Sequence, residues 1–452
     1  MTGSFTEGSI NRQLIIMTAS SVVGMLSMFS VAIVDMFFLS LLDDVDILAG
    51  VGFAGSLLFI CGALGIGFSV STGVLVSQAI GRGGKAEGAE YFSVVFAIAM
   101  ALSAGVALLL WPNLDSLLTL LGASSGAKHQ ALLYMAIVLP SMPLATLGMV
   151  NSSGLRCAAD PAWAMKLSLT ASLINLILDP LLIFGLDLGL QGAAWATVGA
   201  RVTSFLLGIW ILSHRHQLLK VVNLALIRQH FRAFFRIAGP ALVTNLATPV
   251  GGIVVMTYLA PFGSEAVAGS TLVGSLSPLL FAVFFSLSGA AGPIIGQNIG
   301  AKRFDRVGQV IRAGMQLISA YTLLTWALLA ALCPLFIKLY GATGDSAIMI
   351  ETFCYYQIPL ASGLGFLALA NTVFNNCGRP LWSTGFNVLR STLATWLFCH
   401  FGATLLGAQG VVIGSSLTML LFGLSALMLA LRLLRRQQAS LTQPEPGEQA
   451  SC

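Results

Sequence analysis

Long apolar stretches separated by short polar segments dominate the chain. A helix needs about 20 mostly apolar residues to cross the hydrocarbon core of a bilayer. The stretches therefore predict twelve membrane-spanning helices, at residues 14–42, 47–79, 91–111, 131–155, 163–184, 189–212, 233–259, 266–297, 307–330, 352–376, 382–402 and 408–434. The first stretch is much longer than the apolar region of a signal peptide, so we expect it to be a membrane helix and not a cleaved signal.

Composition supports a membrane protein and excludes a water-soluble one. Of 452 residues, 57% are hydrophobic and only 9% are charged, and the mean hydropathy is +0.90. Too little polar surface exists to cover such a chain in water. The seven cysteines are odd in number and show neither a metal-ligand spacing nor a disulfide framework, so we interpret them as packing residues.

The net charge of +5 reflects membrane topology and not a nucleic-acid site. With the N-terminus placed inside, the inner segments contain eighteen Lys and Arg residues, whereas the outer segments contain only Lys128 and Lys338. Basic residues remain on the cytoplasmic side of membrane proteins. We therefore expect both termini in the cytoplasm of a cell whose inner (cytoplasmic) membrane holds the protein.

The two halves of the chain resemble each other in sequence. With a shift of 219 residues, positions 46–81 align without gaps on 265–300 and share eleven identities. An even number of spans in each copy inserts both the same way up, as in transporters built from parallel repeats. The prediction is an all-α integral membrane protein with two six-helix lobes, namely 1–212 and 237–436, a cytoplasmic linker at 213–236 and a disordered tail at 437–452.

Two acids lie within the predicted spans. Asp35 is in the first span and Asp179 in the fifth. A charged side chain inside the bilayer costs a few kcal/mol on insertion scales, so such residues are functional candidates. If both carboxyl groups face one cavity, burial and mutual repulsion favour binding of a proton or cation.

The residues near Asp179 supply further oxygen ligands. Asn175 lies one turn earlier on the same helix face, and Pro180 cannot donate to the carbonyl of Leu176. Thr197 in the sixth span adds a hydroxyl group. Oxygen ligands of this kind suit a hard cation or a proton relay.

A structural explanation of these acids remains open at this point. Asp35 and Asp179 could form unrelated interhelical hydrogen bonds, or pair with Arg201 or Arg390. Arg201 lies one turn after Thr197, and extension of its side chain to the cytoplasmic surface is an equal alternative. Arg390 has no evident partner in the sequence.

Signatures of enzymes and ATPases do not occur. The chain has no phosphate-binding loop of the ATPase type, no zinc-protease motif and no nucleophile elbow. We therefore expect neither an enzyme nor a cofactor, apart from H⁺ or Na⁺ as a coupling ion.

Several motifs together resemble the multidrug and toxic compound extrusion (MATE) transporters, over nearly the whole chain. They are VDMFFL at 34–39, QAIGR at 78–82, GLR at 154–156, DP at 160–161, NLILDPLLIF at 175–184, GAAWAT at 192–197 and GQNIGA at 296–301. The resemblance implies a two-lobed antiporter that exports small organic cations or amphipathic drugs in exchange for H⁺ or Na⁺.

The resemblance also implies a cation site. In the DinF-like branch, the corresponding residues would bind the proton or Na⁺, and here they are Asp35, Asn175, Asp179 and Thr197. The NorM-like branch adds acids in the seventh and tenth helices, but residues 244–248 and 359–361 contain none. The N-terminal lobe should therefore carry the coupling.

The substrate cavity and the competing functions are predicted less directly. We expect the cavity lining to include Met28, Met36, Phe38, Asn151, Arg201, Asn245 and Met256. A flippase for lipid-linked oligosaccharides is the main alternative, and it would require a strongly basic cavity. A membrane enzyme would require a catalytic cluster at one membrane face. We expect a monomer in a lipid bilayer, with no nucleic-acid partner.

Overall fold

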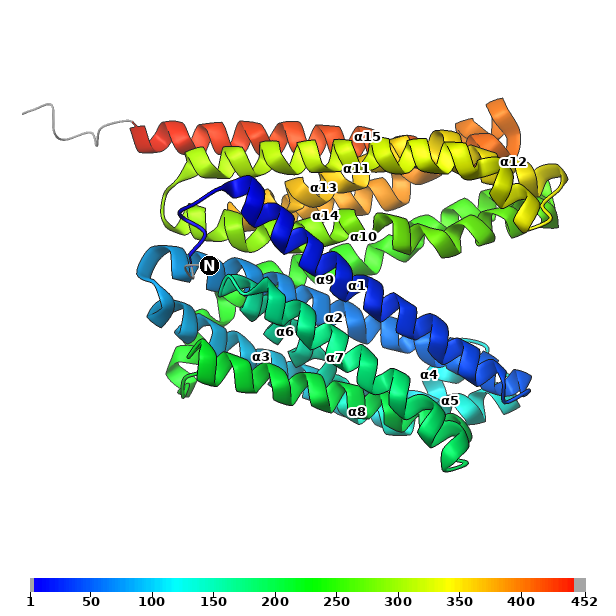
Figure 1. Cartoon of the computed structure of the whole chain (residues 1–452), viewed down its shortest axis with the longest axis horizontal. Coiled ribbons are helices and arrows are strands. Elements are labelled where there is room, and N and C mark those ends of the chain that lie inside the picture. The colour runs from blue at the N-terminus through cyan, green and yellow to red at the C-terminus, as the bar shows by residue number, and fades with distance from the viewer. Residues whose placement is uncertain (1–3, 443–452) are drawn as a thin grey trace, which may run out of the picture. The chain divides into compact units, whose positions relative to one another are not determined.

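A computed structural model describes residues 4–442, and it describes side chains up to residue 439. These residues form helices and no strand (Figure 1). The α-helices are α1 (Ile10–Ser40), α2 (Val45–Gly83), α3 (Lys85–Leu110), α4 (Leu114–Leu120), α5 (Ser125–Val138), α6 (Met142–Cys157), α7 (Pro161–Pro180), α8 (Gly189–Trp210), α9 (Leu224–Leu259), α10 (Ser264–Gly300), α11 (Phe304–Leu339), α12 (Gly344–Thr352), α13 (Ile358–Asn376), α14 (Pro380–Leu389) and α15 (Thr395–Thr442). Short 3₁₀ and π-helical segments join several of them.

Twelve crossings are confirmed in the described part of the chain. Eleven helical stretches are long and apolar enough to span a membrane, and the last runs over 60 residues, from Pro380 to Ala439. At 1.5 Å per residue, such a stretch is roughly 90 Å long, about three times the thickness of the hydrocarbon core. Gly407, with φ 62° and ψ −142°, breaks it into two spans.

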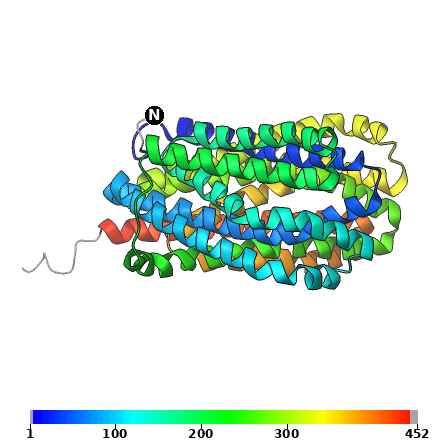
Figure 2. The same cartoon turned by 90° about the horizontal axis from the view of Figure 1, so that it is seen from below.

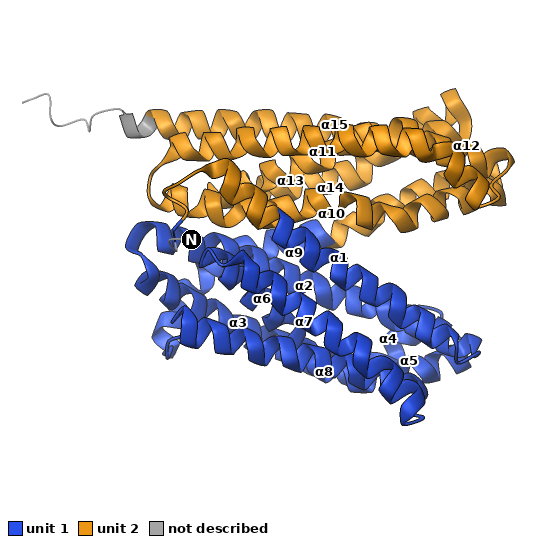
Figure 3. Ribbon diagram, in the orientation of Figure 1, with its two compact units in different colours: residues 1–4, 19–245 blue, residues 5–18, 246–452 orange. Residues whose placement is uncertain are grey.

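The helices form two compact units (Figure 3). Unit 1 contains Ala19–Asn245, and unit 2 contains Phe5–Thr18 together with the chain from Leu246 onward. Within each unit the long helices run side by side along a common direction (Figures 1 and 2). Helices α1 and α9 each belong to both units, because the boundaries fall inside them.

The predicted linker at 213–236 is mostly helical. Its irregular part is short, because α9 begins at Leu224 and Asn223 Oδ1 accepts a hydrogen bond from the N–H of Leu226 at 2.8 Å. The basic residues of this segment lie on an amphipathic helix, the beginning of α9. Its apolar face includes the fully buried Phe234, whose ring lies 5.2 Å from that of Phe68.

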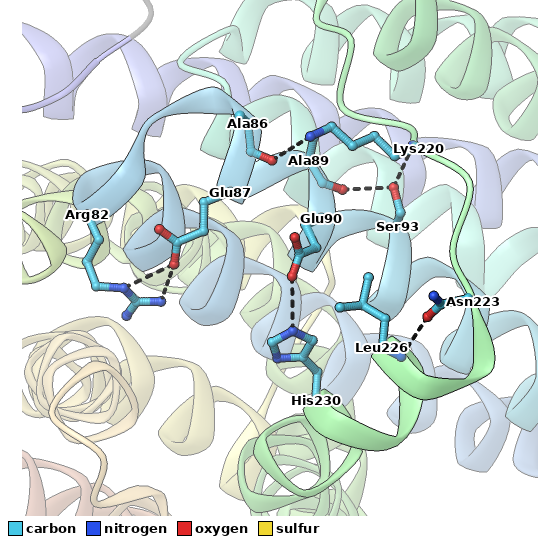
Figure 4. A network of polar contacts seen from close by, with 10 residues as sticks. All are labelled: Arg82, Ala86, Glu87, Ala89, Glu90, Ser93, Lys220, Asn223, Leu226 and His230. Atoms are coloured by element: carbon cyan, nitrogen blue, oxygen red, sulfur yellow. Dashed lines mark hydrogen bonds and ion pairs between the residues drawn. The ribbon is translucent and has the colours of Figure 1, made fainter.

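Polar contacts fix the irregular segment to α3 within unit 1 (Figure 4). The backbone N–H of Lys220 donates to Ser93 Oγ at 2.8 Å, and the Lys220 ammonium group donates to the carbonyl of Ala86 at 2.9 Å. Farther along, His230 lies 3.3 Å from Glu90. The loop between the repeats is therefore part of the packing of unit 1.

The neighbouring His216 contacts the aspartate that caps α7. Its Nε2 lies 3.1 Å from Asp160 Oδ2, and the Asp160 side chain accepts a hydrogen bond from the backbone N–H of Trp163. Burial lowers the pKa of His216, although the Asp160 carboxylate acts in the opposite direction. The contact joins the irregular segment to the beginning of α7.

The predicted disordered tail is helical in its first part. Helix α15 continues to Thr442, so the residues from 437 to 442 extend the last span. The remainder of the predicted tail lies outside the described residues.

Glycines allow the helices of unit 2 to approach closely. A Cβ atom at Gly363 of α13 would overlap the carbonyl of Met419 on α15, and one at Gly423 would overlap the carbonyl of Gly363. Gly402 and Gly410 make the same kind of contact across the bend at Gly407. Such contacts replace the hydrophobic driving force that helices lack in lipid.

The segment before α1 is anchored in unit 2. Phe5 is fully buried, and its N–H donates to Gln297 Oε1 at 2.6 Å. The carbonyl of Phe5 accepts from Asn298 at 3.2 Å and from Arg306 at 3.1 Å, and Arg306 also donates to the carbonyl of Gly8. The start of α1 is therefore held by the end of α10 and the beginning of α11.

We expect Gly407→Ala to destabilise the protein by roughly 1–3 kcal/mol, because this backbone conformation is essentially restricted to glycine. Thermal unfolding in detergent measures the effect. Gly274→Ala is the matched control, since a Cβ atom at Gly274 meets no neighbour within 4 Å. Equal melting temperatures for the two variants would show that the bend tolerates a side chain.

We also expect Phe5→Ala to destabilise the protein, by about 3–5 kcal/mol, because it empties a fully enclosed aromatic site. Ile15→Ala provides the control, because Ile15 on α1 is 55% exposed. The same unfolding measurement applies. A loss no larger than that of the control would show that the anchor contributes little stability.

Candidate functional site

Helices α1 and α7 run in the same direction within unit 1, and their contacting residues keep a nearly constant separation in sequence. A Cβ atom at Gly24 would lie 3.3 Å from the side chain of Ser168, and one helical turn later Ser172 Oγ donates to Ser27 Oγ at 3.2 Å. Each pair is separated by 144 or 145 residues. The same separation, continued along both helices, places Asp35 beside Asp179.

The two carboxyl groups lie within hydrogen-bonding range of each other. Asp179 is fully buried and Asp35 is half-buried. Asp35 Oδ1 and both carboxylate oxygens of Asp179 have no hydrogen-bond partner among the described residues. Ionised carboxylates only accept hydrogen bonds, so the pair needs a proton or a cation between them.

Asn175 adds a fourth acceptor to the acid pair. Its side chain is 4% exposed and its Oδ1 has no donor in the described structure. Asn175 lies one turn before Asp179 on α7, and residues at this spacing share a helix face. Four buried acceptor oxygens thus have no donor in the described part of the chain.

A proline and a close helix contact shape this region. Helix α7 ends at Pro180, and a π-helical turn, Leu181–Gly185, follows. Helix α8 approaches that turn through Gly192, where a Cβ atom would lie 2.6 Å from the carbonyl carbon of Leu182. The close approach carries Thr197 of α8 into the same part of unit 1.

Tyr134 of α5 belongs to the site, although the sequence analysis did not identify it. Its hydroxyl group lies within hydrogen-bonding range of Thr197, and it interacts electrostatically with Asp35, Asp179 and Arg201. The available signal was weak: a tyrosine inside an apolar span needs a partner for its hydroxyl group. Only the packing of α5 against α8 identifies that partner.

Among the described residues, Arg201 neither pairs with an acid nor extends to the cytoplasmic surface, the two alternatives considered from the sequence. Its Nη1 donates to the carbonyl of Val138 at 3.0 Å and to Ser141 Oγ at 2.8 Å. Val138 precedes the 3₁₀ turn Leu139–Ser141 that joins α5 to α6, and Ser141 is its last residue. The guanidinium group therefore stabilises an irregular backbone segment and forms no ion pair with the acids in the described structure.

The predicted cavity residues of unit 1 differ in their surroundings. Met28 and Met36 are 53% and 44% exposed, whereas Phe38 packs its ring 6.2 Å from that of Phe184. Asn151 is fully buried and lies against Gly208 of α8. Asn151 therefore lies in the contact between α6 and α8, and its role in a substrate cavity stays a prediction.

The remaining predicted cavity residues are divided between the units. Asn245 donates to the carbonyl of Ala241 within α9 at 2.8 Å and is the last residue of unit 1. Met256 belongs to unit 2 and is 37% exposed. A shared substrate cavity for these residues stays a prediction.

A protein-family model matches this chain twice, once in each half of the internal repeat. The model of the MatE family matches residues 20–181 and again residues 240–401. The second match begins 220 residues after the first, close to the shift found in the sequence. Together the two matches cover more than half of the chain.

The chain is similar over most of its length to known transporters. It is 28% identical over 431 residues to the FAD transporter of Shewanella oneidensis, covering 94% of this chain and 95% of the relative. It is 24% identical over 377 residues to the multidrug export protein MepA of Staphylococcus haemolyticus, covering 80% of this chain and 81% of the relative.

The fold matches that of a solved MATE structure. The Vibrio cholerae MATE transporter VcmN in the bent form superposes with a TM-score of 0.89 at 25% identity, over 95% of this chain and 98% of VcmN. With the repeated family match and the twelve crossings, this similarity shows that the chain belongs to the MatE family of multi-pass membrane transporters, which handle small organic molecules and are not enzymes.

Proposed function

We propose that this protein is a secondary antiporter that exports amphipathic or cationic small organic molecules in exchange for H⁺ or Na⁺. The observation that carries the proposal is the set of four buried acceptor oxygens without donors, on Asp35, Asn175 and Asp179. A proton or a sodium ion satisfies such a set, and Thr197 adds a hydroxyl oxygen beside it. The assignment to the DinF-like branch stays a prediction with this site.

Ion binding changes the balance of forces between α1 and α7. Without an ion, two facing carboxylates repel each other in a medium with little water. A bound proton or Na⁺ converts this repulsion into a shared contact and tightens the packing at Asp35. Because α1 continues into unit 2 through Phe5–Thr18, the helix is a direct covalent path from the acid pair to the other unit.

The ion gradient supplies the free energy. One elementary charge that moves across 100 mV releases about 2.3 kcal/mol. The acid pair can use this energy only if occupancy by the ion and occupancy by the substrate favour different conformations. Export then requires that the ion enters from outside and the substrate from the cytoplasm, in line with cytoplasmic termini in an inner membrane.

The names of the relatives support the substrate class. MepA is a multidrug export protein, and the relative from Shewanella oneidensis is an FAD transporter. Multidrug export supports amphipathic drugs as substrates. Since FAD is an aromatic compound with phosphate groups, we include aromatic phosphates in the proposed range. We propose a monomer as the working unit.

A flippase for lipid-linked oligosaccharides has less support. It requires several free basic groups for a pyrophosphate, but the guanidinium group of Arg201 is already bonded to Val138 and Ser141, so a single intramembrane arginine, Arg390, is left without a partner among the described residues. The transport assays below separate the two functions, since a flippase moves a lipid and exports no soluble dye.

We expect Asp35→Asn and Asp179→Asn each to reduce ion-coupled efflux at least tenfold, because an amide cannot take up a proton or provide a charge for Na⁺. Efflux of ethidium from proteoliposomes measures this effect, first under an imposed pH gradient and then under a sodium gradient. Asp115→Asn is the control. Asp115 lies outside the site and forms an ion pair with Lys128, with 2.8 Å between Oδ1 and Nζ. Efflux at the wild-type rate in Asp35→Asn would reject the coupling role.

We expect Tyr134→Phe to weaken coupling-ion binding on the order of fivefold, the equivalent of one hydrogen bond of about 1 kcal/mol. The maximal efflux rate should change little, since both carboxyl groups remain. The measurement is the dependence of efflux on the concentration of the coupling ion. Tyr321→Phe makes the same chemical change in unit 2, where the hydroxyl group donates to the carbonyl of Leu280. Identical ion dependence in both variants would remove Tyr134 from the site.

A further inference from the structure

A further charged group, Arg390, lies inside a span of unit 2. Arg390 begins the π-helical segment Arg390–Ala394 that joins α14 to α15. It follows Pro380, where α14 begins, by ten residues, or about 15 Å of helix at 1.5 Å per residue. The hydrocarbon core is about 30 Å thick, so a span that begins at the membrane surface at Pro380 would place Arg390 near the middle of the core. From there the side chain is too short to reach either membrane surface.

The Arg390 side chain has no partner in the described structure. It is 8% exposed, its Nε is enclosed without a hydrogen bond, and it takes part in no ion pair. Arg201, the other arginine at depth, has two acceptors. A buried guanidinium group without an acceptor is expensive, and a ligand that supplies the missing acceptor would offset this cost.

The helix around Arg390 carries several polar side chains, and these donate hydrogen bonds to backbone carbonyl groups of the same helical segment. Asn387 donates to the carbonyl of Ser383 at 2.8 Å, and Ser391 Oγ donates to the carbonyl of Val388 at 3.3 Å. Thr395 Oγ1 donates to the carbonyl of Arg390 itself at 2.7 Å. These side chains are buried, and the guanidinium group is the charge among them.

The backbone around Arg390 is held in place. Gly251 of α9 packs against Ser391, where a Cβ atom would lie 3.2 Å from the Ser391 carbonyl oxygen. π-Helical turns occur frequently at functional sites, because they redirect side chains from a regular helix. The stretch from Pro380 to Ala439 contains no acid that could neutralise the arginine. The position therefore offers a fixed, uncompensated positive charge.

We propose that Arg390 binds a phosphate group of a transported substrate. Guanidinium groups bind phosphate through two parallel hydrogen bonds, which a neutral or cationic substrate cannot offer. The inference rests on the proposed function and deepens it: Arg390 of unit 2 selects for small organic phosphates, whereas the acid pair of unit 1 binds the coupling ion. The two roles belong to different residues and are separable.

Flavin mononucleotide and riboflavin test this proposal, because they share one ring system and differ by a single phosphate group. Binding to the purified full-length protein is measured by quenching of flavin fluorescence, and uptake is measured in proteoliposomes. The wild-type protein should bind flavin mononucleotide at least tenfold more tightly than riboflavin. Arg390→Gln should abolish this preference and change riboflavin affinity less than twofold.

Two further variants make the result specific. Arg390→Lys keeps the charge but not the bidentate geometry, so it should retain part of the preference; it also serves if Arg390→Gln does not fold. Arg312→Gln removes one exposed charge from the same unit and should leave the preference unchanged. Thermal unfolding of each variant shows whether the fold is intact.

Several outcomes would overturn the proposal. Equal affinity of the wild-type protein for the two flavins would do so, as would an equal loss of both flavins in folded Arg390→Gln or an unchanged preference in that variant. Failure of the proposed function gives a different result: ethidium efflux would then be independent of both ion gradients, while the flavin preference in detergent would still depend on Arg390.

Discussion

The bilayer interior contains no water to solvate a polar group, and the other features of this protein depend on that constraint. Backbone groups are satisfied within helices, while buried side chains need partners in the protein or a ligand. Most polar side chains here donate to a carbonyl one turn earlier. Asp35 and Asp179 cannot do so, because ionised carboxylates have no proton to donate. Their need for a proton or cation is the physical origin of the proposed coupling.

Helix α1 has a special place in this arrangement. Its beginning is anchored in unit 2 through Phe5, whose backbone is bonded to the ends of α10 and α11. Its later part packs on α7 in unit 1 through Gly24 and Ser27. Residues 5–18 and residues 19–40 of this one stretch of chain thus belong to different units. In the proposed mechanism, this covalent continuity connects ion binding at Asp35 with unit 2.

The two intramembrane arginines differ in whether the protein supplies acceptors for their guanidinium groups. Arg201 has two acceptors beside a 3₁₀ turn, so its charge is used to stabilise the protein. Arg390 has none among the described residues, so its charge remains available to a ligand. The sequence shows both as equally unusual, because each is one basic residue in an apolar span. Their difference depends on which backbone carbonyls lie nearby in three dimensions.

The sequence by itself determined the membrane class, the twelve crossings, the repeat and the acids, because each depends on local hydropathy or on a single charged residue in an apolar stretch. The tertiary structure alone decided that Tyr134 lies beside Thr197, that Asn151 lies against α8 and that Phe5 belongs to unit 2. Those facts depend on the register between helices far apart in the chain. Local pattern does not specify that register, since in lipid it is set by small residues such as Gly24 and Gly192 that allow one helix to approach another.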